Sequence, residues 1–115
     1  MSLGLSLVLV FSQLPTGLDP PTSRAELSFG IAAARRGLWV EARFRFERAV
    51  ALDPENVQAL NDLAVSLEQQ GEFEKARETY ERALKLKPGS TYVQQNYDLF
   101  READAKRNRK SKKHP

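Results

Sequence analysis

The fold of this chain is decided by the stretch from Ala59 to Pro88, which reads ALNDLAVSLEQQGEFEKARETYERALKLKP. It contains two runs of apolar residues at helical spacing, and each run therefore lies on one face of a helix. The first run is Leu60, Leu63, Ala64 and Leu67, and the second is Ala76, Tyr80, Ala83 and Leu84. Gly71 stands between the runs, and Pro88 cannot continue the second helix. The stretch predicts two helices joined by a short turn.

The same pattern occurs once more, 34 residues earlier in the chain. Six pairs of residues match at this offset: Gly37 and Gly71, Ala42 and Ala76, Phe46 and Tyr80, Ala49 and Ala83, Leu52 and Leu86, Pro54 and Pro88. The alanines are small enough for two antiparallel helices to approach closely, and the aromatic residues fill the wider gap between neighbouring helix pairs. Each glycine favours the left-handed backbone that commonly ends a helix. The constant offset indicates an internal repeat.

Helical signals continue on both sides of this repeat. Ser23 with Glu26 and Thr91 with Gln94 are typical capping boxes, and their starts are 68 residues apart, twice the repeat length. We therefore predict five helices, at about residues 23–36, 39–52, 56–70, 73–86 and 91–105. The predicted fold class is all-α.

With this 34-residue repeat and these matched residues, the chain resembles the tetratricopeptide repeat family. Residues 55–88 resemble one full repeat, and residues 23–54 resemble a more degenerate copy that keeps Phe29, Gly30 and the matched residues named above. Residues 89–105 resemble the closing helix that seals such arrays, and the chain as a whole is similar to small bacterial members. The resemblance implies a solenoid of antiparallel helix pairs in right-handed superhelical stacking. It is specific for the fold and unspecific for function.

The resemblance also implies a concave surface, lined by the first helix of each pair, that binds a peptide or a single helix of a partner protein. The groove positions on the first helix are Arg24, Leu27, Ile31, Ala34 and Arg35. Those on the second pair are Gln58, Asn61, Val65, Glu68 and Gln69, and those on the closing helix are Tyr92, Gln95, Leu99 and Glu102. Leu27, Ile31, Val65 and Leu99 are expected to form an apolar strip, the amides to pair with a peptide backbone and Tyr92 to act as an aromatic anchor.

Each of these residues also has a purely structural interpretation. Leu27 and Ile31 are equally compatible with a cover formed by the N-terminal segment. Val65 and Leu99 are compatible with shallow core positions, and Tyr92 with an ordinary end cap. Trp39 is expected to pack at the turn between helices rather than to mark a ligand site.

One specialisation of the family is absent. Its chaperone-docking members hold a C-terminal carboxylate with lysine, asparagine and arginine side chains. The corresponding residues here are Leu27, Ile31, Asp62, Tyr92 and Asn96. None is a cation, and Asp62 is expected to repel an acidic peptide.

Composition argues against catalysis. The 115 residues include no cysteine, and the one histidine, His114, is the second-last residue, so neither a thiol nor a rigidly held imidazole is available. No metal-ligand cluster, glycine-rich phosphate loop or serine–histidine arrangement occurs. Carboxylates such as Glu68, Glu72 and Glu74 are expected on solvated helix faces. We predict a protein without catalytic activity, metal or cofactor.

The N-terminal region, residues 1–22, consists of an apolar run from Leu3 to Phe11 and a proline-rich linker. The run is too short to cross a bilayer as a helix, but its length suits the apolar part of a secretory signal. No lysine or arginine precedes it and no clean cleavage site follows, so a cover over the first helix and an artefact of the sequence's origin remain alternatives. Cytoplasmic and exported locations are equally compatible.

The first predicted helix is apolar on nearly every side between Ala25 and Ala34. An outer helix of this composition requires a cover. The candidates are residues 3–14, a second copy of the chain or a partner protein, and we expect this end to self-associate or dock.

The C-terminal region, residues 106–115, is strongly basic. Its cations are Lys106, Arg107, Arg109, Lys110, Lys112 and Lys113, which leaves 12 basic and 15 acidic residues in the preceding 105. Such a like-charge block is expected to be disordered and solvated. It favours a solubilising tail; binding of nucleic acid or an anionic membrane, and a localisation signal, are the alternatives. The leading functional hypothesis is a protein-interaction module, and its rival is an electrostatic adaptor acting through this tail.

Overall fold

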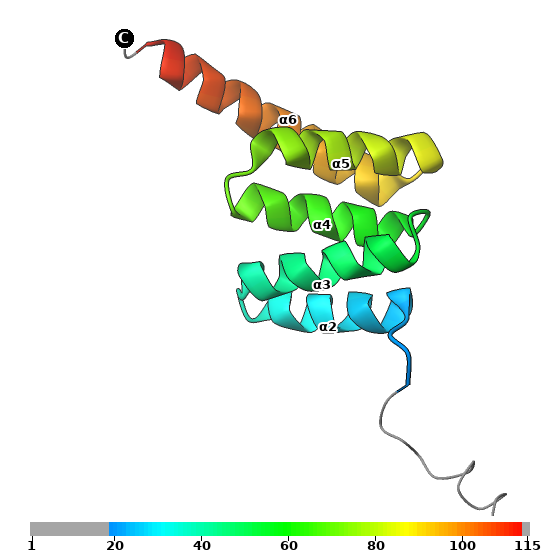
Figure 1. The fold of residues 1–115 in the computed structure, drawn as a ribbon. Helices are drawn as coiled ribbons and strands as arrows, with labels where there is room; N and C mark the ends of the chain where they lie inside the picture. The colour runs from blue at the N-terminus through cyan, green and yellow to red at the C-terminus, as the bar shows by residue number, and fades with distance from the viewer. Residues whose placement is uncertain (1–18, 114–115) are drawn as a thin grey trace, which may run out of the picture.

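The computed structural model describes residues 19–113, and within that range the regular secondary structure is all α-helix, with no strand (Figure 1). Its helices are α2 (Ser23–Arg35), α3 (Trp39–Leu52), α4 (Val57–Gln69), α5 (Phe73–Leu86) and α6 (Thr91–Lys112). The five predicted helices are all present, and the all-α helix-pair solenoid is confirmed. The predictions for the apolar run at the N-terminus and for His114 lie outside the described residues.

Two glycines make the turns within the helix pairs. Gly37 and Gly71 have φ angles of 74° and 78°, the left-handed region that side chains disfavour. In the first turn the Gly37 amide donates to the Ala34 carbonyl at 2.9 Å and the Leu38 amide donates to the Ala33 carbonyl at 3.0 Å. The second turn repeats this arrangement 34 residues later. The glycines thus satisfy carbonyls that the end of a helix would otherwise leave unpaired.

The helix starts differ by one residue from the predicted capping boxes. The cap of α2 is Thr22, whose hydroxyl accepts from the Ala25 amide at 3.0 Å. Ser23 instead joins two elements: its hydroxyl donates to the Ala49 carbonyl at 2.8 Å and accepts from the Asn56 side chain at 2.9 Å. At α6 the cap is Ser90, and Thr91 is the first helical residue.

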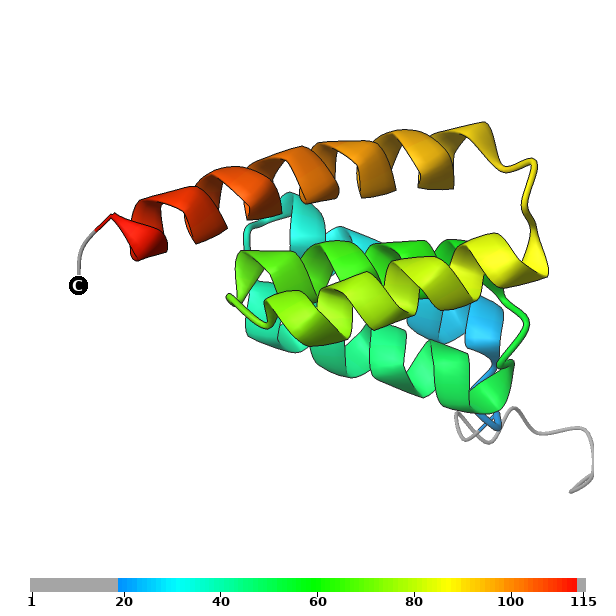
Figure 2. The same cartoon turned by 90° about the horizontal axis from the view of Figure 1, so that it is seen from above.

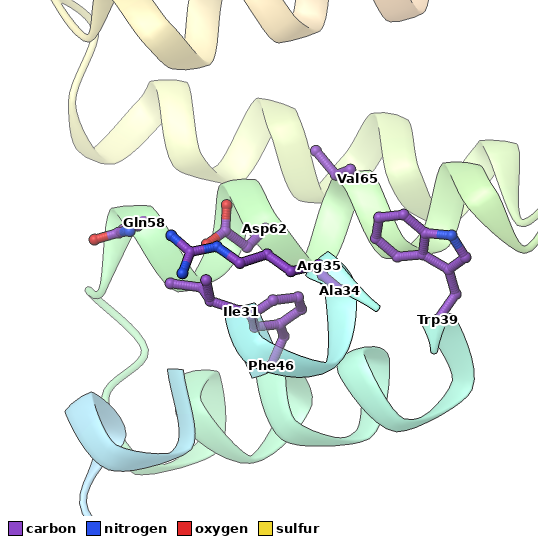
Figure 3. A pocket seen from close by; sticks show the side chains of 8 residues that line it. All are labelled: Ile31, Ala34, Arg35, Trp39, Phe46, Gln58, Asp62 and Val65. Carbon is purple, nitrogen blue, oxygen red and sulfur yellow. The ribbon is translucent and has the colours of Figure 1, made fainter. Parts of the chain in front are cut away.

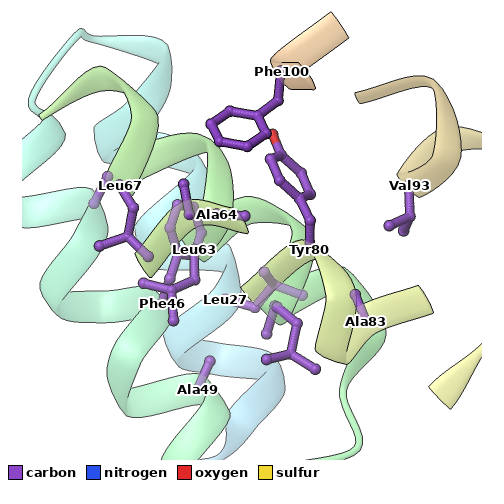
Figure 4. Packing of buried hydrophobic residues seen from close by; sticks show 14 of the residues in the cluster. Leu27, Phe46, Ala49, Leu63, Ala64, Leu67, Tyr80, Ala83, Val93 and Phe100 are labelled. Atoms are coloured by element: carbon purple, nitrogen blue, oxygen red, sulfur yellow. The ribbon is translucent and has the colours of Figure 1, made fainter. Parts of the chain in front are cut away.

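The repeated small and aromatic residues form the core, as the repeat predicted (Figure 4). The four matched alanines are fully buried, and Phe46 and Tyr80 are 1% exposed. Figure 4 shows Tyr80 directed toward Phe100 of α6. The rings of these two residues are 5.6 Å apart, so an aromatic contact joins α6 to the second pair.

Helix α6 is longer than predicted, and the prediction of a disordered tail is wrong for residues 106–112. The reason lies at Asp104, which is buried and paired with Arg77 of α5 and, at 3.2 Å, with Arg107. The Arg107 guanidinium also lies 3.5 Å from the centre of the Phe73 ring. These contacts hold the helix past its predicted end at residue 105, and it continues for about two turns to Lys112. The remaining lysines and arginines suit the negative end of the helix dipole. Figure 2 shows the last turns of α6 extending past the other helices.

Among the described residues, no helix is both long enough and apolar enough to cross a membrane.

Candidate functional site

The first helices of successive pairs lie side by side. Helix α4 contacts both α2 and α6, whereas within residues 19–113 no comparable contact joins α3 to α5. The side of the stack formed by α2, α4 and α6 is therefore the inner side of its curve. Side chains on this side face the concave surface that the sequence predicts.

A hollow of about 430 Å³ opens between α2 and α4, with α3 at its base (Figure 3). It is lined by Ile31, Ala34, Arg35, Trp39, Phe46, Gln58, Asp62 and Val65. Five of these residues are among the predicted groove positions: Ile31, Ala34, Arg35, Gln58 and Val65. The volume is in the range of sites that hold a small ligand or one to two side chains of a peptide.

The lining of the hollow is mainly apolar. Ile31, Ala34 and Val65 are half-buried and pack against the core, which leaves part of each side chain available to a partner. Trp39 closes one end of the hollow in Figure 3, so it contributes to the site as well as to the turn between α2 and α3. Gln58 lies toward the opposite end and is exposed. The hollow therefore offers apolar walls with a polar amide at its rim.

Asp62 also lines the hollow; the sequence analysis placed it among the positions that correspond to the family's carboxylate-binding residues and expected it to repel an acidic peptide. Its carboxylate is half-buried and accepts one hydrogen bond, from the Asn61 side chain at 3.2 Å. Burial raises the pKa of Asp62 above its ordinary value, and the Asn61 hydrogen bond only partly opposes this. Among residues 19–113 no lysine or arginine forms an ion pair with it.

Sequence signals for this site were present but incomplete. The residue type and the neighbouring Asn61 were visible in the sequence, and so was the apolar character of α2. What was missing was the depth of the hollow beside Asp62, which depends on how closely α2 and α4 approach.

Two predicted groove residues are buried instead, and both predictions are corrected. Leu27 is 8% exposed and belongs to the core, so it offers no apolar surface to a partner. Asn61 is 4% exposed, and its side chain accepts from Asn96 of α6 at 3.1 Å while it donates to Asp62. The amide is thus occupied in joining α4 to α6.

The remaining predicted residues do not line the hollow, and all of them except Glu68 are exposed. Tyr92 and Leu99 on α6 are 42% and 65% exposed, which excludes a core position for Leu99. Gln95 and Glu102 on α6, Arg24 at the start of α2 and Gln69 at the end of α4 are exposed as well. Glu68 is half-buried and accepts from the Tyr80 hydroxyl at 2.5 Å. The predicted groove residues on α6 therefore lie outside the hollow.

A second apolar surface lies on the first helix pair, and we call it the outer face. It consists of Phe29, Leu38, Val40 and Phe44, which are 58%, 46%, 75% and 51% exposed. The guanidinium of Arg45 lies 5.2 Å from the centre of the Phe29 ring and 5.8 Å from that of Phe44. The sequence pointed to an uncovered α2 but did not show that α3 contributes to the same surface.

Carboxylates elsewhere in the described part are engaged in ion pairs or exposed, except Glu68, for which the expected solvated position is wrong. Glu72 lies 3.9 Å from Arg43, and Glu74 lies 3.4 Å from Arg77. No group of histidine, cysteine and acidic side chains in residues 19–113 has the arrangement of a metal site.

Comparisons with known proteins agree with this geometry. The family model described as "Tetratricopeptide repeat" matches residues 27–91. Comparison with curated protein sequences gives no match.

Solved structures give the same fold. The first tetratricopeptide domain of Spaghetti (RPAP3), bound to the HSP90 peptide SRMEEVD, is similar with a TM-score of 0.71 and 23% identity, over 76% of this chain and 69% of that one. The C-terminal domain of a Plasmodium falciparum FK506-binding protein, which contains these repeats, is similar with a TM-score of 0.68 and 24% identity, over 76% of this chain and 58% of that one.

Proposed function

This chain belongs to the tetratricopeptide repeat family, and we propose that it is a protein-interaction module that binds a peptide or helix of a partner protein in the hollow between α2 and α4. The observation that carries the proposal is the hollow itself, because residues from two first helices of the repeat line one opening with apolar walls. Proteins of this family generally serve as non-catalytic scaffolds, and we propose the same here.

The partner proposed here differs from that of the structural neighbour. The peptide bound by Spaghetti is rich in acidic residues. In this chain the hollow contains Asp62, and none of the five positions that correspond to the family's carboxylate-binding residues is a cation. We therefore do not carry the neighbour's ligand over.

A pulldown from native lysate tests the proposal with three forms of the chain. We expect the Ile31→Glu/Val65→Glu variant to lose the partner because two charges enter the apolar walls. Leu99→Glu is the matched control, since it adds a charge to an exposed predicted groove residue on α6 outside the hollow. Thermal melts establish that the variants fold. If the partner is lost only with Leu99→Glu, the binding surface lies on α6 and the proposal for the hollow fails.

We further propose that the outer face forms a contact between two copies of the chain. In the second pair the residue at the repeat position of Phe29 is Leu63, which is buried in the core of the stack. Phe29 thus occupies a position that a preceding helix pair covers in a longer array. Sedimentation of wild type and a Phe29→Ser/Phe44→Ser variant over a concentration series tests this. A wild type that remains monomeric at all concentrations contradicts it.

The rival hypothesis places the activity in the basic C-terminus. It is favoured by the extension of α6, which carries Lys106, Arg109, Lys110 and Lys113 around one shallow surface. A chain ending at Ala105 separates the two hypotheses, because it removes these cations and leaves the hollow intact. Loss of partner on truncation, together with sensitivity to salt or nuclease, supports the rival.

A further inference from the structure

The hollow between α2 and α4 contains one carboxylate and one guanidinium, and the two differ in their surroundings. Asp62 is half-buried among the apolar walls, whereas Arg35 is exposed at the rim. Figure 3 shows the Arg35 side chain extending along the hollow toward the end where Gln58 and Asp62 lie. No ion pair joins it to Asp62. The half-buried carboxylate of Asp62 therefore lacks a cation from its own chain within the described part.

We propose that Asp62 determines the specificity of the hollow by pairing with a lysine or arginine side chain of the partner peptide. The inference rests on the proposed function, since it concerns what the same hollow binds. The partner peptide is accordingly expected to contain one lysine or arginine with apolar residues beside it.

Charge complementarity is the first argument. A carboxylate taken out of water loses solvation that a single neutral hydrogen bond from Asn61 does not replace. The raised pKa of Asp62, caused mainly by burial, reflects this imbalance. A partner cation within the hollow compensates the carboxylate in surroundings where the attraction is screened less than at the surface.

The shape of the hollow is the second argument. Lysine and arginine carry long aliphatic stems below their charged groups. Ile31, Ala34 and Val65 line the approach to Asp62, so they match such a stem, and Trp39 offers an aromatic surface to an apolar neighbour in the peptide. An acidic or neutral polar side chain matches neither the walls nor the charge.

Arg35 does not prevent this arrangement. It is exposed, so its guanidinium can move into solvent at small cost when a partner enters. Its charge at the rim also repels a second cation. We expect one cationic position in the peptide rather than a basic stretch.

The first helix pair has no equivalent subsite. The residue 34 positions before Asp62 is Ser28, which is exposed and uncharged. The specificity is thus located at one point of the concave surface, and one substitution tests it.

Selection from a phage-displayed library of random peptides provides the test, with wild type, Asp62→Asn and Glu78→Gln as baits. Asp62→Asn keeps the shape of the side chain and its ability to accept from Asn61. Glu78→Gln removes one negative charge from an exposed position on α5 outside the hollow. Peptides selected by wild type are synthesised with a dye and titrated against all three proteins by fluorescence anisotropy, and thermal melts verify folding.

We expect the wild-type peptides to share one lysine or arginine among apolar residues. Their affinity should fall by about tenfold or more in Asp62→Asn and remain unchanged in Glu78→Gln. Replacing the shared cation by norleucine should cause a similar loss with wild type and little further loss with Asp62→Asn.

Three outcomes overturn the inference. Selected peptides without a shared cation, equal affinity for wild type and Asp62→Asn, or equal losses in both charge variants each contradict it. Failure of the proposed function is a different result: either no peptide is enriched, or binding survives Ile31→Glu/Val65→Glu. Peptides that require the apolar walls but no cation refute the role of Asp62 and leave the proposed function standing.

Discussion

The first helix pair, α2 and α3, and the second, α4 and α5, have the same fold but differ in how their cores are packed. In the second pair Ala64 lies in the core together with Tyr80, and both are buried. At the same two repeat positions the first pair has Gly30 and Phe46. A Cβ atom on Gly30 would lie 2.4 Å from Cε1 of Phe46, so the ring occupies the space that a methyl group fills in the second pair. The repeat conserves the fit between a small and an aromatic residue rather than the residues themselves.

The outward surfaces of the two pairs differ even more. Leu38, Val40 and Phe44 are exposed on the first pair, and Glu72, Glu74 and Glu78 stand at the same positions on the second. The second pair is thus suited to solvent on this side, and the first to contact with another apolar surface. Helices that are equivalent in the fold are therefore different in function.

Gly30→Ala is the substitution with the largest expected effect on this comparison. The added methyl group meets the buried ring of Phe46, and such overpacking costs about 1–3 kcal/mol. The higher helix propensity of alanine offsets up to about 1 kcal/mol of this loss in stability. We expect a net loss of about 1–2 kcal/mol in the free energy of unfolding, measured by urea denaturation.

Two further variants sharpen this result. Ala64→Gly in the second pair should also destabilise, by about 1–2 kcal/mol, because it loses helix propensity and a buried methyl group. Phe46→Leu should destabilise the Gly30→Ala variant less than it destabilises the wild type, since the smaller side chain makes room for the added methyl group. Additive effects would mean that Gly30 and Phe46 are not fitted to each other.

Tyr80→Phe has the next largest effect. The Tyr80 hydroxyl donates to Glu68 at 2.5 Å, and burial together with this hydrogen bond raises the pKa of Tyr80 above its ordinary value. The hydroxyl therefore stays protonated, and its removal should cost about 1 kcal/mol in urea denaturation. The first pair has Phe46 and Ala34 at these two positions. Phe46→Tyr alone should not raise the free energy of unfolding, because the first pair has no acceptor for the added hydroxyl. Together with Ala34→Glu, which supplies an acceptor, it should raise it. Additive effects of these two changes would contradict this account.

The same comparison explains how far sequence reasoning reached. The 34-residue offset predicted the helices and their core because glycine, alanine and aromatic positions follow directly from local geometry. It predicted Leu27 as a groove residue because that position faces the concave side in the family. In this chain the same side chain is buried in the core instead. Residues whose environment depends on contacts distant in sequence were therefore the ones misjudged.

The end of α6 and the burial of Asp62 were missed for related reasons. A run of cations predicts repulsion, but the contacts of Arg107 with Asp104 and Phe73 bring together residues from different elements. The depth of Asp62 likewise depends on the approach of α2 to α4. Neither contact has a signal in a single sequence.

Asp62→Asn should stabilise the protein, by about 1 kcal/mol at neutral pH, because it removes a carboxylate that is partly buried without a cation. Since the pKa of Asp62 is raised by burial, its charge opposes folding above the ordinary value of 3.8 and has no effect below it. The stability difference between variant and wild type should therefore vanish in acid and grow as the pH rises. At the equivalent position of the first pair, the uncharged Ser28 provides the control, and Ser28→Asn should show no such pH dependence.

Glu26→Leu has the smallest expected effect at neutral pH, and it tests whether the two pairs are interchangeable at one position. Glu26 is buried and lies 3.2 Å from both Arg45 and Arg48, whereas the second pair has the buried Leu60 at this position. Replacing a buried ion pair by an apolar side chain is often nearly neutral. The two arginines are partly exposed and can return to solvent, so the change in the free energy of unfolding should stay within about 1 kcal/mol.

The difference between Glu26→Leu and wild type should then appear in acid. Burial alone would raise the pKa of Glu26, but the hydrogen bonds and charges of Arg45 and Arg48 outweigh it and hold the pKa below the ordinary value of 4.5. The carboxylate therefore stabilises the fold above pH 4.5, and this contribution is lost as the pH falls through the lowered pKa. Thermal melts should show wild type losing stability in acid relative to Glu26→Leu, and Glu26→Gln should be the least stable of the three at neutral pH because it removes the charge and keeps a buried polar group. If Glu26→Leu instead unfolds the protein at neutral pH, the first pair depends on its ion pairs and the two pairs cannot exchange residues at this position.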